Sequence, residues 1–179
     1  MRLFNAVRAF ALFATLLVST LVCANGLAQA KPLNVVATTS MIADAARQVA
    51  GERAHVTALM GPGVDPPSHR QTRSDIAAIA RADLVLWHGL DLEAQLEEFF
   101  LDLAKRRNVV AVGEAIEKDK LLSHANYKGR YDPHVWMDPQ LWGTVVYAVR
   151  DALIKTDPEG EATYRSNADK HVAEIAKLV

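Results

Sequence analysis

The feature that most constrains this chain is a regular alternation between short β-branched runs and longer stretches with helical spacing. The strand-like runs are Leu33–Ala37, His55–Leu59, Leu84–Trp87 and Val109–Val112. Such alternation predicts a parallel sheet covered by helices on both faces, because parallel neighbours need a crossover connection. We therefore expect an α/β fold in which a parallel four-stranded sheet carries flanking helices.

Local signals predict where the helices begin and end. The predicted boundaries are a stop at Gly51 after the periodic stretch Ile42–Val49, a capping box of Thr72 and Asp75, a cap at Asp91, and a cap at Asp138 followed by Pro139. A last helical pattern starts at Glu159, and its apolar stripe of Ala168, Val172, Ile175 and Val179 reaches the final residue. A stripe of this kind predicts packing against further protein.

Parallel sheets of this type bind ligands at the carboxyl end of their strands, where the strand-to-helix loops meet. By this rule Thr38–Ser40, Gly61–Arg73, His88-Gly89 and the loop that ends at His134 meet along one rim. Three of the six histidines lie there, namely His69, His88 and His134. The other three, His55, His124 and His171, are expected to be solvated or hydrogen-bonded.

Residues 1–30 differ in kind from the rest of the chain. Two arginines precede an apolar run of about 16 residues, shorter than the roughly 20 that span a bilayer. Ala28-Gln29-Ala30 supplies the small residues that a signal peptidase accepts, so we expect a secretory signal peptide, cleavage near Lys31 and a periplasmic protein. The one cysteine, Cys23, leaves with this segment, so a metal site must use nitrogen and oxygen ligands.

Charge and motifs exclude other classes of protein. The formal net charge is −1, and it becomes −3 without the two arginines of the signal peptide. Lys105-Arg106-Arg107 is the only basic run, and it stands where a helix should end, so it does not predict binding to nucleic acid. The G-x-S-x-G elbow, the phosphate loop and the dinucleotide turn are all missing from the sequence. We therefore expect neither a nucleic-acid-binding protein nor an enzyme.

Three motifs together carry a family resemblance. They are MGPGVDPPSHRQTRSD at 60–75, ADLVLWHGLDLE at 82–93 and YDPHVWMDPQLW at 131–142. In this order and spacing they resemble the metal-binding solute receptors of manganese and zinc ABC importers, the cluster A-I group. The resemblance covers residues 33–179 and implies the amino-terminal lobe of a two-lobed periplasmic protein. Residues 31–157 would form the lobe, and residues 158–179 the truncated start of a long connecting helix.

The resemblance also implies a set of metal ligands. Each of the family's two Asp-Pro phrases carries a ligating histidine directly after the proline, and His134 matches the second of them. Pro67 stands in place of the first and offers no electron pair, so His69, two residues later, is a candidate substitute. His88, which directly follows a strand, is a third candidate. The family's remaining ligands, a histidine or glutamate and an aspartate, belong to the second lobe, which we expect this chain to lack.

The function implied by the resemblance is capture of a divalent transition metal ion, manganese or zinc, for an ABC permease in the inner membrane. We expect the receptor to act as a monomer. Zinc-selective members often carry a histidine-rich insertion after the fourth strand, where this chain has only His124. That difference favours manganese, or a receptor that accepts both ions. One alternative stays open, a relic or interaction domain that has lost metal binding, with Pro67 recording the loss.

Overall fold

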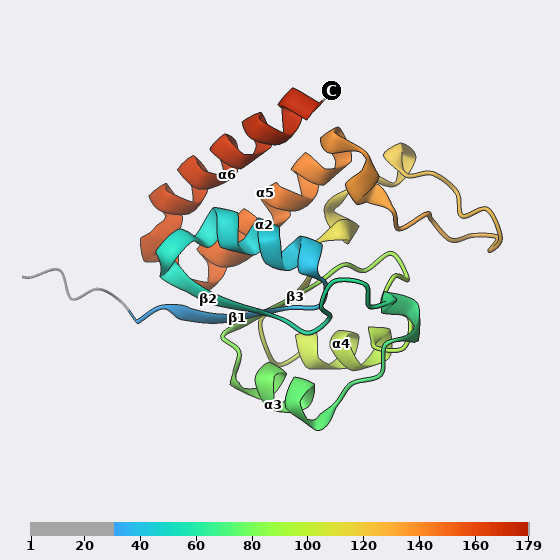
Figure 1. Ribbon diagram of the computed structural model, residues 1–179, viewed down its shortest axis with the longest axis horizontal. Helices are drawn as coiled ribbons and strands as arrows, with labels where there is room; N and C mark the ends of the chain where they lie inside the picture. The colour runs from blue at the N-terminus through green and yellow to red at the C-terminus, as the bar shows by residue number, and fades with distance from the viewer. Residues whose placement is uncertain (1–30, 179) are drawn as a thin grey trace, which may run out of the picture. The chain divides into compact units, whose positions relative to one another are not determined.

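The computed structural model of the chain describes residues 31–178, so the predicted signal peptide and Cys23 lie outside the described residues. Its sheet has the order β2-β1-β3-β4 and is parallel throughout (Figure 1). The strands are β1 (Leu33–Ala37), β2 (Ala54–Ala58), β3 (Leu84–Trp87) and β4 (Val109–Ala111). The predicted α/β fold with a parallel four-stranded sheet is confirmed.

Five α-helices in the described part of the chain cover both faces of the sheet. They are α2 (Ser40–Ala50), α3 (Arg73–Arg81), α4 (Glu97–Ala104), α5 (Pro139–Thr156) and α6 (Glu161–Ile175). Helices α2, α5 and α6 lie on one face, and α3 and α4 lie on the other (Figure 1). Alternate residues of each strand serve the two cores, since Val35 and Ala37 pack under α2 and α5 while Val36 packs toward α3 and α4.

The predicted caps at Thr72 and Asp138 are confirmed. Thr72 Oγ1 accepts a hydrogen bond from the Asp75 amide at 3.2 Å, and Asp75 Oδ2 accepts one from the Thr72 amide at 2.8 Å. Asp138 Oδ1 accepts from the amides of Gln140 and Leu141 at 2.8 and 3.2 Å, directly before α5. These caps fix where the two rim loops end, because each loop runs into its helix at a defined residue.

The predicted cap at Asp91 is wrong, because α4 begins only at Glu97. Gly89, Leu90 and Asp91 have φ values of 79°, 54° and 61°, so three successive residues adopt the left-handed conformation. Two of them carry side chains for which this conformation is strained. The chain therefore makes a tight turn at the rim before α4 starts.

Helix α6 packs back onto the chain itself. Tyr164 and Ala168 are buried, and Val172 and Ile175 pack at the edge of the same core as α2 and α5. At the start of α6, Asp157 accepts hydrogen bonds from Arg53 at 2.7 and 2.9 Å and from the Tyr164 hydroxyl at 2.5 Å. The apolar stripe that predicted packing against further protein is thus partly used within the chain. Within residues 31–178, we find no helix whose length and hydropathy would suit a membrane span.

Candidate metal-binding site at the rim

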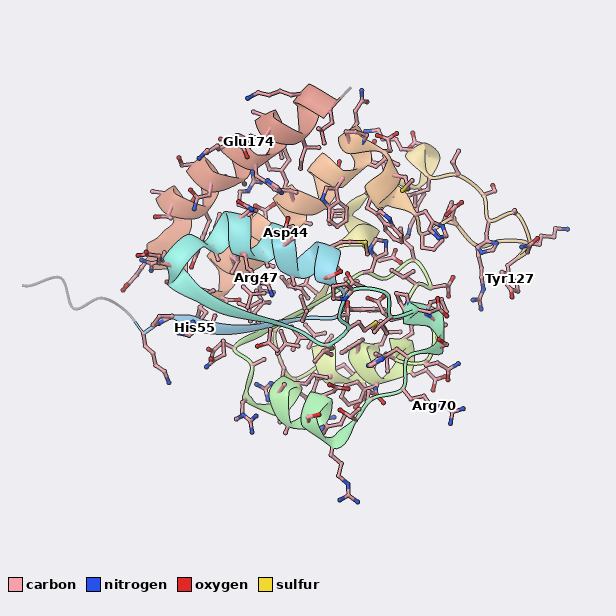
Figure 2. All side chains as sticks on the ribbon, in the orientation of Figure 1. Asp44, Arg47, His55, Arg70, Tyr127 and Glu174 are labelled. Carbon is pink, nitrogen blue, oxygen red and sulfur yellow. The ribbon has the colours of Figure 1, made fainter. Side chains whose placement is uncertain are left out.

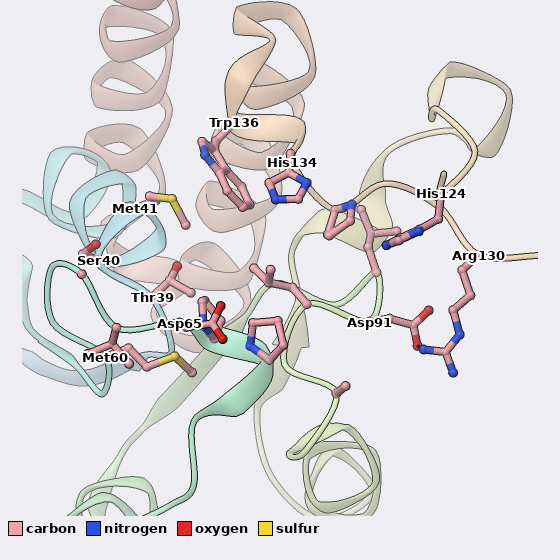
Figure 3. A pocket seen from close by; sticks show the side chains of 18 of the residues that line it. Thr39, Ser40, Met41, Met60, Asp65, Asp91, His124, Arg130, His134 and Trp136 are labelled. Atoms are coloured by element: carbon pink, nitrogen blue, oxygen red, sulfur yellow. Dashed lines mark ion pairs between the residues drawn. The ribbon is translucent and has the colours of Figure 1, made fainter. Parts of the chain in front are cut away.

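The predicted convergence of loops at the carboxyl end of the strands is confirmed. A pocket of about 460 Å³ opens there, and it is lined by residues that follow β1, β2, β3 and β4. Figure 3 shows His134 and Trp136 on one side of this pocket, across from Asp65 and Met60. We call residues 61–72 the first loop and residues 122–138 the second loop, because each contains one Asp-Pro phrase.

His134 lies on the pocket wall with 61% of its side chain exposed. Asp132 Oδ1 lies 2.5 Å from His134 Nδ1 and also accepts the His134 backbone amide at 3.0 Å. Hydrogen bonds from the backbone and then the side chain of His134 hold the pKa of Asp132 below its usual value. The carboxylate therefore orients the ring and leaves Nε2 as the nitrogen that can bind a ligand. An imidazole oriented by a carboxylate is the usual arrangement of a metal-binding histidine.

The first loop places proline, not histidine, on the pocket wall. Asp65, Pro66 and Pro67 line the pocket, and the 3-10 turn Pro66–Ser68 carries them. His69 follows this turn and is not among the lining residues, since its side chain is only 14% exposed and its Nε2 lies 3.5 Å from Asp75 Oδ2. The histidine that the resemblance implies at position 67 is therefore absent from this wall, and the nearby His69 faces α3.

His88 lies at the end of β3, fully buried behind the pocket wall. Its Nε2 is 2.8 Å from the carbonyl oxygen of Pro133, and its ring meets the Trp136 ring edge-on at 5.5 Å between centroids. Burial lowers the pKa of His88 to about 4, so the ring is neutral near pH 7. Because a carbonyl only accepts, the single ring proton is on Nε2. The other nitrogen, Nδ1, has no hydrogen-bond partner among the described residues.

Two carboxylates hold the tight turn that follows His88. Glu93 is fully buried, and it accepts hydrogen bonds from the amides of His88 and Gly89 at 2.8 and 3.2 Å and from the Thr38 hydroxyl at 2.5 Å. Burial raises the pKa of Glu93. Glu114 accepts the Leu90 amide at 3.0 Å and pairs with Lys118, and although burial opposes it, these hydrogen bonds hold the pKa of Glu114 below its usual value. Three successive amides of the strained turn are thereby satisfied.

Some residues of the pocket were not predicted from the sequence. His124, Tyr127 and Arg130 come from the second loop, and Asp91 pairs with Arg130 at 3.2 Å. Figure 2 shows Tyr127 far out on this loop, at the other end of the molecule from His55 on β2. The loop has neither strand nor helix periodicity, so only its position between two rim elements signalled that it reaches the pocket.

The described residues do not form a complete metal centre. Within residues 31–178, no three His, Cys, Asp or Glu side chains are grouped closely enough to hold an ion. Of the three predicted ligands, the structure places His134 at the pocket and keeps His69 and His88 behind its surface. Ligation by His69 or His88 stays a prediction. His88 would have to bind through Nδ1, its unprotonated nitrogen, and either ring would have to become accessible from the pocket.

Comparison with known proteins gives a consistent result. Residues 35–179 match the family described as zinc-uptake complex component A, periplasmic (ZnuA). The chain is 38% identical to the manganese-binding lipoprotein MntA of Bacillus subtilis over 146 residues, which are 82% of this chain and 47% of that protein. It is 32% identical to the iron-binding protein YfeA of Yersinia pestis over 177 residues, which cover 96% of this chain and 56% of that protein.

The zinc-binding protein TroA of Treponema pallidum is similar in both sequence and structure. The sequences are 40% identical over 151 residues, which are 84% of this chain and 48% of that protein. Its solved structure superposes with a TM-score of 0.77 and covers 83% of this chain and 52% of the TroA chain. This chain thus spans about half the length of the curated relatives that it matches.

Proposed function

Because the chain belongs to the family of periplasmic zinc-uptake component A proteins, we propose that it captures a divalent transition metal ion at the rim pocket. The observation that carries this proposal is His134, whose ring is oriented by Asp132 and exposed on the pocket wall. The ion is cargo to be released, and we propose no enzymatic activity for the chain.

We propose His134 as the principal ligand, through Nε2. His69 and His88 are secondary candidates, because neither ring lines the pocket and each would have to become accessible from it. Asp65 lies across the pocket from His134 (Figure 3). Its carboxylate is the side chain of the first loop's pocket lining that could bind a metal ion. With one oriented histidine and water in the remaining positions, the site should bind weakly. Structural zinc sites with four ligands have binding free energies of roughly 10–16 kcal/mol. About half of that free energy corresponds to dissociation constants in the micromolar to millimolar range.

The names of the relatives specify different ions, namely manganese, zinc and iron. We therefore base the proposed metal preference of this chain on its ligands. An open site built on imidazole follows the intrinsic order of metal affinity, in which zinc lies well above manganese. We therefore propose that this chain alone binds zinc more tightly than manganese, even if manganese is the ion that the transport system carries.

We further propose that the receptor acts in the periplasm, as a monomer, and hands its ion to the permease of an ABC importer in the inner membrane. The match to a periplasmic family supports the compartment, and the relatives named as ABC transporter substrate-binding lipoproteins support the partner. Mass spectrometry of periplasmic material should show a chain that starts near Lys31. Light scattering of that material should give the mass of one chain.

The test of the binding proposal is a calorimetric titration of the chain from Lys31 onward with zinc and then with manganese. We expect saturable zinc binding with a dissociation constant between about 1 μM and 1 mM, and weaker manganese binding. Competition with a chelator of known affinity extends the measurement to sites that are too tight for a direct titration. Absence of saturable heat with both ions at millimolar concentration would contradict the proposal.

A second candidate function is an interaction domain that no longer binds metal. Pro67 favours it, because this side chain occupies the first-loop wall without any atom that could ligate an ion. The titration separates the two candidates, since an interaction domain of this kind should show no specific heat with either ion while keeping the same fold by circular dichroism.

A further inference from the structure

The buried histidine at the end of β3 has a geometry that suits a role different from ligation. Four hydrogen bonds tie residue 88 and its neighbour to other elements of the chain. The His88 and Gly89 amides donate to Glu93, the His88 carbonyl accepts from the Gly113 amide at 2.8 Å, and the ring donates to the Pro133 carbonyl at 2.8 Å. His88 thus links β3 to the segment after β4 and to the second loop.

The packing around His88 shows that this link is tightly constrained. A Cβ atom added to Gly113 would lie 2.6 Å from the His88 carbonyl oxygen and 3.3 Å from the His88 Nε2 atom. Glycine is therefore required at position 113 for the backbone to come this close. On the other side the ring meets Trp136 edge-on, and Trp136 in turn lies 5.1 Å, between centroids, from the His134 ring. The ring has no room to rotate away from Pro133 without moving one of these groups.

The contact that His88 makes on the second loop is at the residue directly before His134. Pro133 has no amide hydrogen, so its carbonyl is its one backbone hydrogen-bonding group, and this carbonyl accepts both from the His88 ring and from the Val135 amide, each at 2.8 Å. Pro133 and Val135 are buried while His134 between them is exposed. Fixing the Pro133 carbonyl therefore sets the direction in which the backbone presents the His134 side chain. Asp132 then sets the rotation of the ring itself.

Glu93 holds the backbone at His88 in place. Its carboxylate accepts three hydrogen bonds, and these come from the end of β1 and from the turn after β3. A buried carboxyl group with three donors keeps its neighbours in place, because moving any of them would leave a buried donor or acceptor unsatisfied. The chain of contacts runs from Thr38 through Glu93 and His88 to Pro133 and ends at His134.

We infer that His88, held by Glu93, is a positioning residue that presents His134 to the metal ion through the hydrogen bond from its Nε2 to the Pro133 carbonyl. The effect of His88 on metal affinity rests on the proposed function, in which His134 is the principal ligand. The hydrogen bond itself is a property of the metal-free chain. Outer partners of this kind, when removed, typically cost tenfold to a hundredfold in metal affinity.

The first arm of the test measures the hydrogen bond without metal. Long-range ¹H–¹⁵N correlation spectra of the metal-free chain should show His88 as a neutral ring protonated at Nε2, with a slowly exchanging proton and a coupling across the hydrogen bond to the Pro133 carbonyl carbon. A ring protonated at Nδ1, or a rapidly exchanging Nε2 proton, would overturn the inference even if zinc binds.

The second arm measures zinc affinity in a matched pair of variants. His88→Gln keeps an N–H donor at a similar reach, whereas His88→Met has a similar size and no donor. We expect His88→Met to lose about tenfold in zinc affinity and His88→Gln to stay within about threefold of the parent. Equal losses in both variants, or no loss in His88→Met, would contradict positioning by this hydrogen bond.

The two arms separate failure of the inference from failure of the proposed function. If the parent chain does not bind zinc, the proposed function fails, and the first arm still decides whether His88 holds the second loop. His88→Met should then raise the amide exchange rate of Val135 relative to the parent, with the amides of α3 as an internal control. His55→Met, at an exposed position of strand β2, is the control for the substitution itself.

Discussion

The first and second loops contain the same Asp-Pro phrase but are held in place in different ways. The second loop is tied to the core in its middle, where His88 binds the Pro133 carbonyl and Val135 is buried next to it. The first loop is held mainly near its ends, by the Met60 amide on the Thr38 carbonyl and by the capping box at Thr72. Between these points its hydrogen bonds are local, such as that from Ser68 Oγ to the Asp65 carbonyl at 3.1 Å.

This difference shows that similar Asp-Pro phrases present different side chains to the pocket. On the second loop the phrase delivers an exposed, oriented imidazole. On the first loop a local 3-10 turn delivers a proline to the pocket, and the histidine two residues later packs toward Asp75. The four predictions below test this contrast, from the largest expected effect to the smallest.

The largest effect should come from His134→Ala. Removing the oriented ring should weaken zinc binding by on the order of a hundredfold, about 2.7 kcal/mol, because this ring is the exposed imidazole that Asp132 orients on the pocket wall. The fold should survive, because an exposed side chain contributes little packing. Calorimetry gives the affinity and circular dichroism the fold. An affinity equal to that of the parent would remove His134 from the site.

Next in size is a loss of stability that leaves both loops alone, in Asp157→Asn. Burial would raise the pKa of Asp157, but hydrogen bonds from Tyr164 and Arg53 hold it below its usual value. Ionised Asp157 therefore stabilises the fold above about pH 4, and this contribution is lost as the pH falls through the lowered pKa. The variant should lose about 2 kcal/mol at pH 7, and less at pH 3.

Chemical denaturation at the two pH values measures this difference. Zinc affinity at pH 7 should stay within about twofold of the parent, because Asp157 lies at the opposite end of the strands from the pocket. The variant is thus the control that separates a loss of binding from a loss of stability. An equal loss of unfolding free energy at both pH values would rule out the ionised Asp157–Arg53 pair as the source of this stability.

A smaller effect, in the opposite direction, is expected from Pro67→His. The substitution places an imidazole on the first-loop wall of the pocket, so zinc binding should tighten by about tenfold, or 1.4 kcal/mol. Pro67→Ala is the matched control, because it removes the proline without adding a ligand. If both variants bind alike, then the freedom of the loop, and not the missing ligand, limits the first half of the site.

The smallest effect is expected from His69→Ala. Since the His69 ring faces Asp75 and is not part of the pocket lining, zinc affinity should change by less than about twofold. A loss of affinity comparable to that of His134→Ala would show that His69 swings into the pocket when metal binds. In that case the first loop is a rearranged half-site, whereas an unchanged affinity together with a gain in Pro67→His identifies a damaged one.

The fold was predictable because its signals are periodic and local. Short apolar runs marked β1 and β3 at their observed ends, and the caps at Thr72 and Asp138 follow from one hydroxyl or carboxylate close to its amides. The start of α4 was not predictable in the same way. Asp91 is a residue type that often caps helices, but here it lies in a left-handed turn whose preceding amides donate to Glu93. These hydrogen bonds depend on the burial of Glu93, which the local sequence does not reveal.

The site was predictable only as far as topology extends. Strand order explains why His134 and the first loop share one rim, so that convergence followed from the sequence. The direction of each side chain did not, because His69 and His88 are turned by contacts with Asp75 and Pro133 that come from other segments. The reach of His124 and Arg130 into the pocket depends on a loop without periodicity, so its sequence position placed the loop at the rim but did not indicate which of its side chains line the pocket.

The position of β1 in the middle of the sheet has a consequence for how the chain folds. Strand β1 comes first along the described chain, yet one of its two partners is β3, and Val35 pairs with Leu84 across 48 intervening residues. Sheet closure therefore waits for a long loop to close, which makes it slow compared with helix formation. Until β3 arrives, one edge of an apolar strand stays open, and this edge is the place where a partly folded chain is most prone to aggregate.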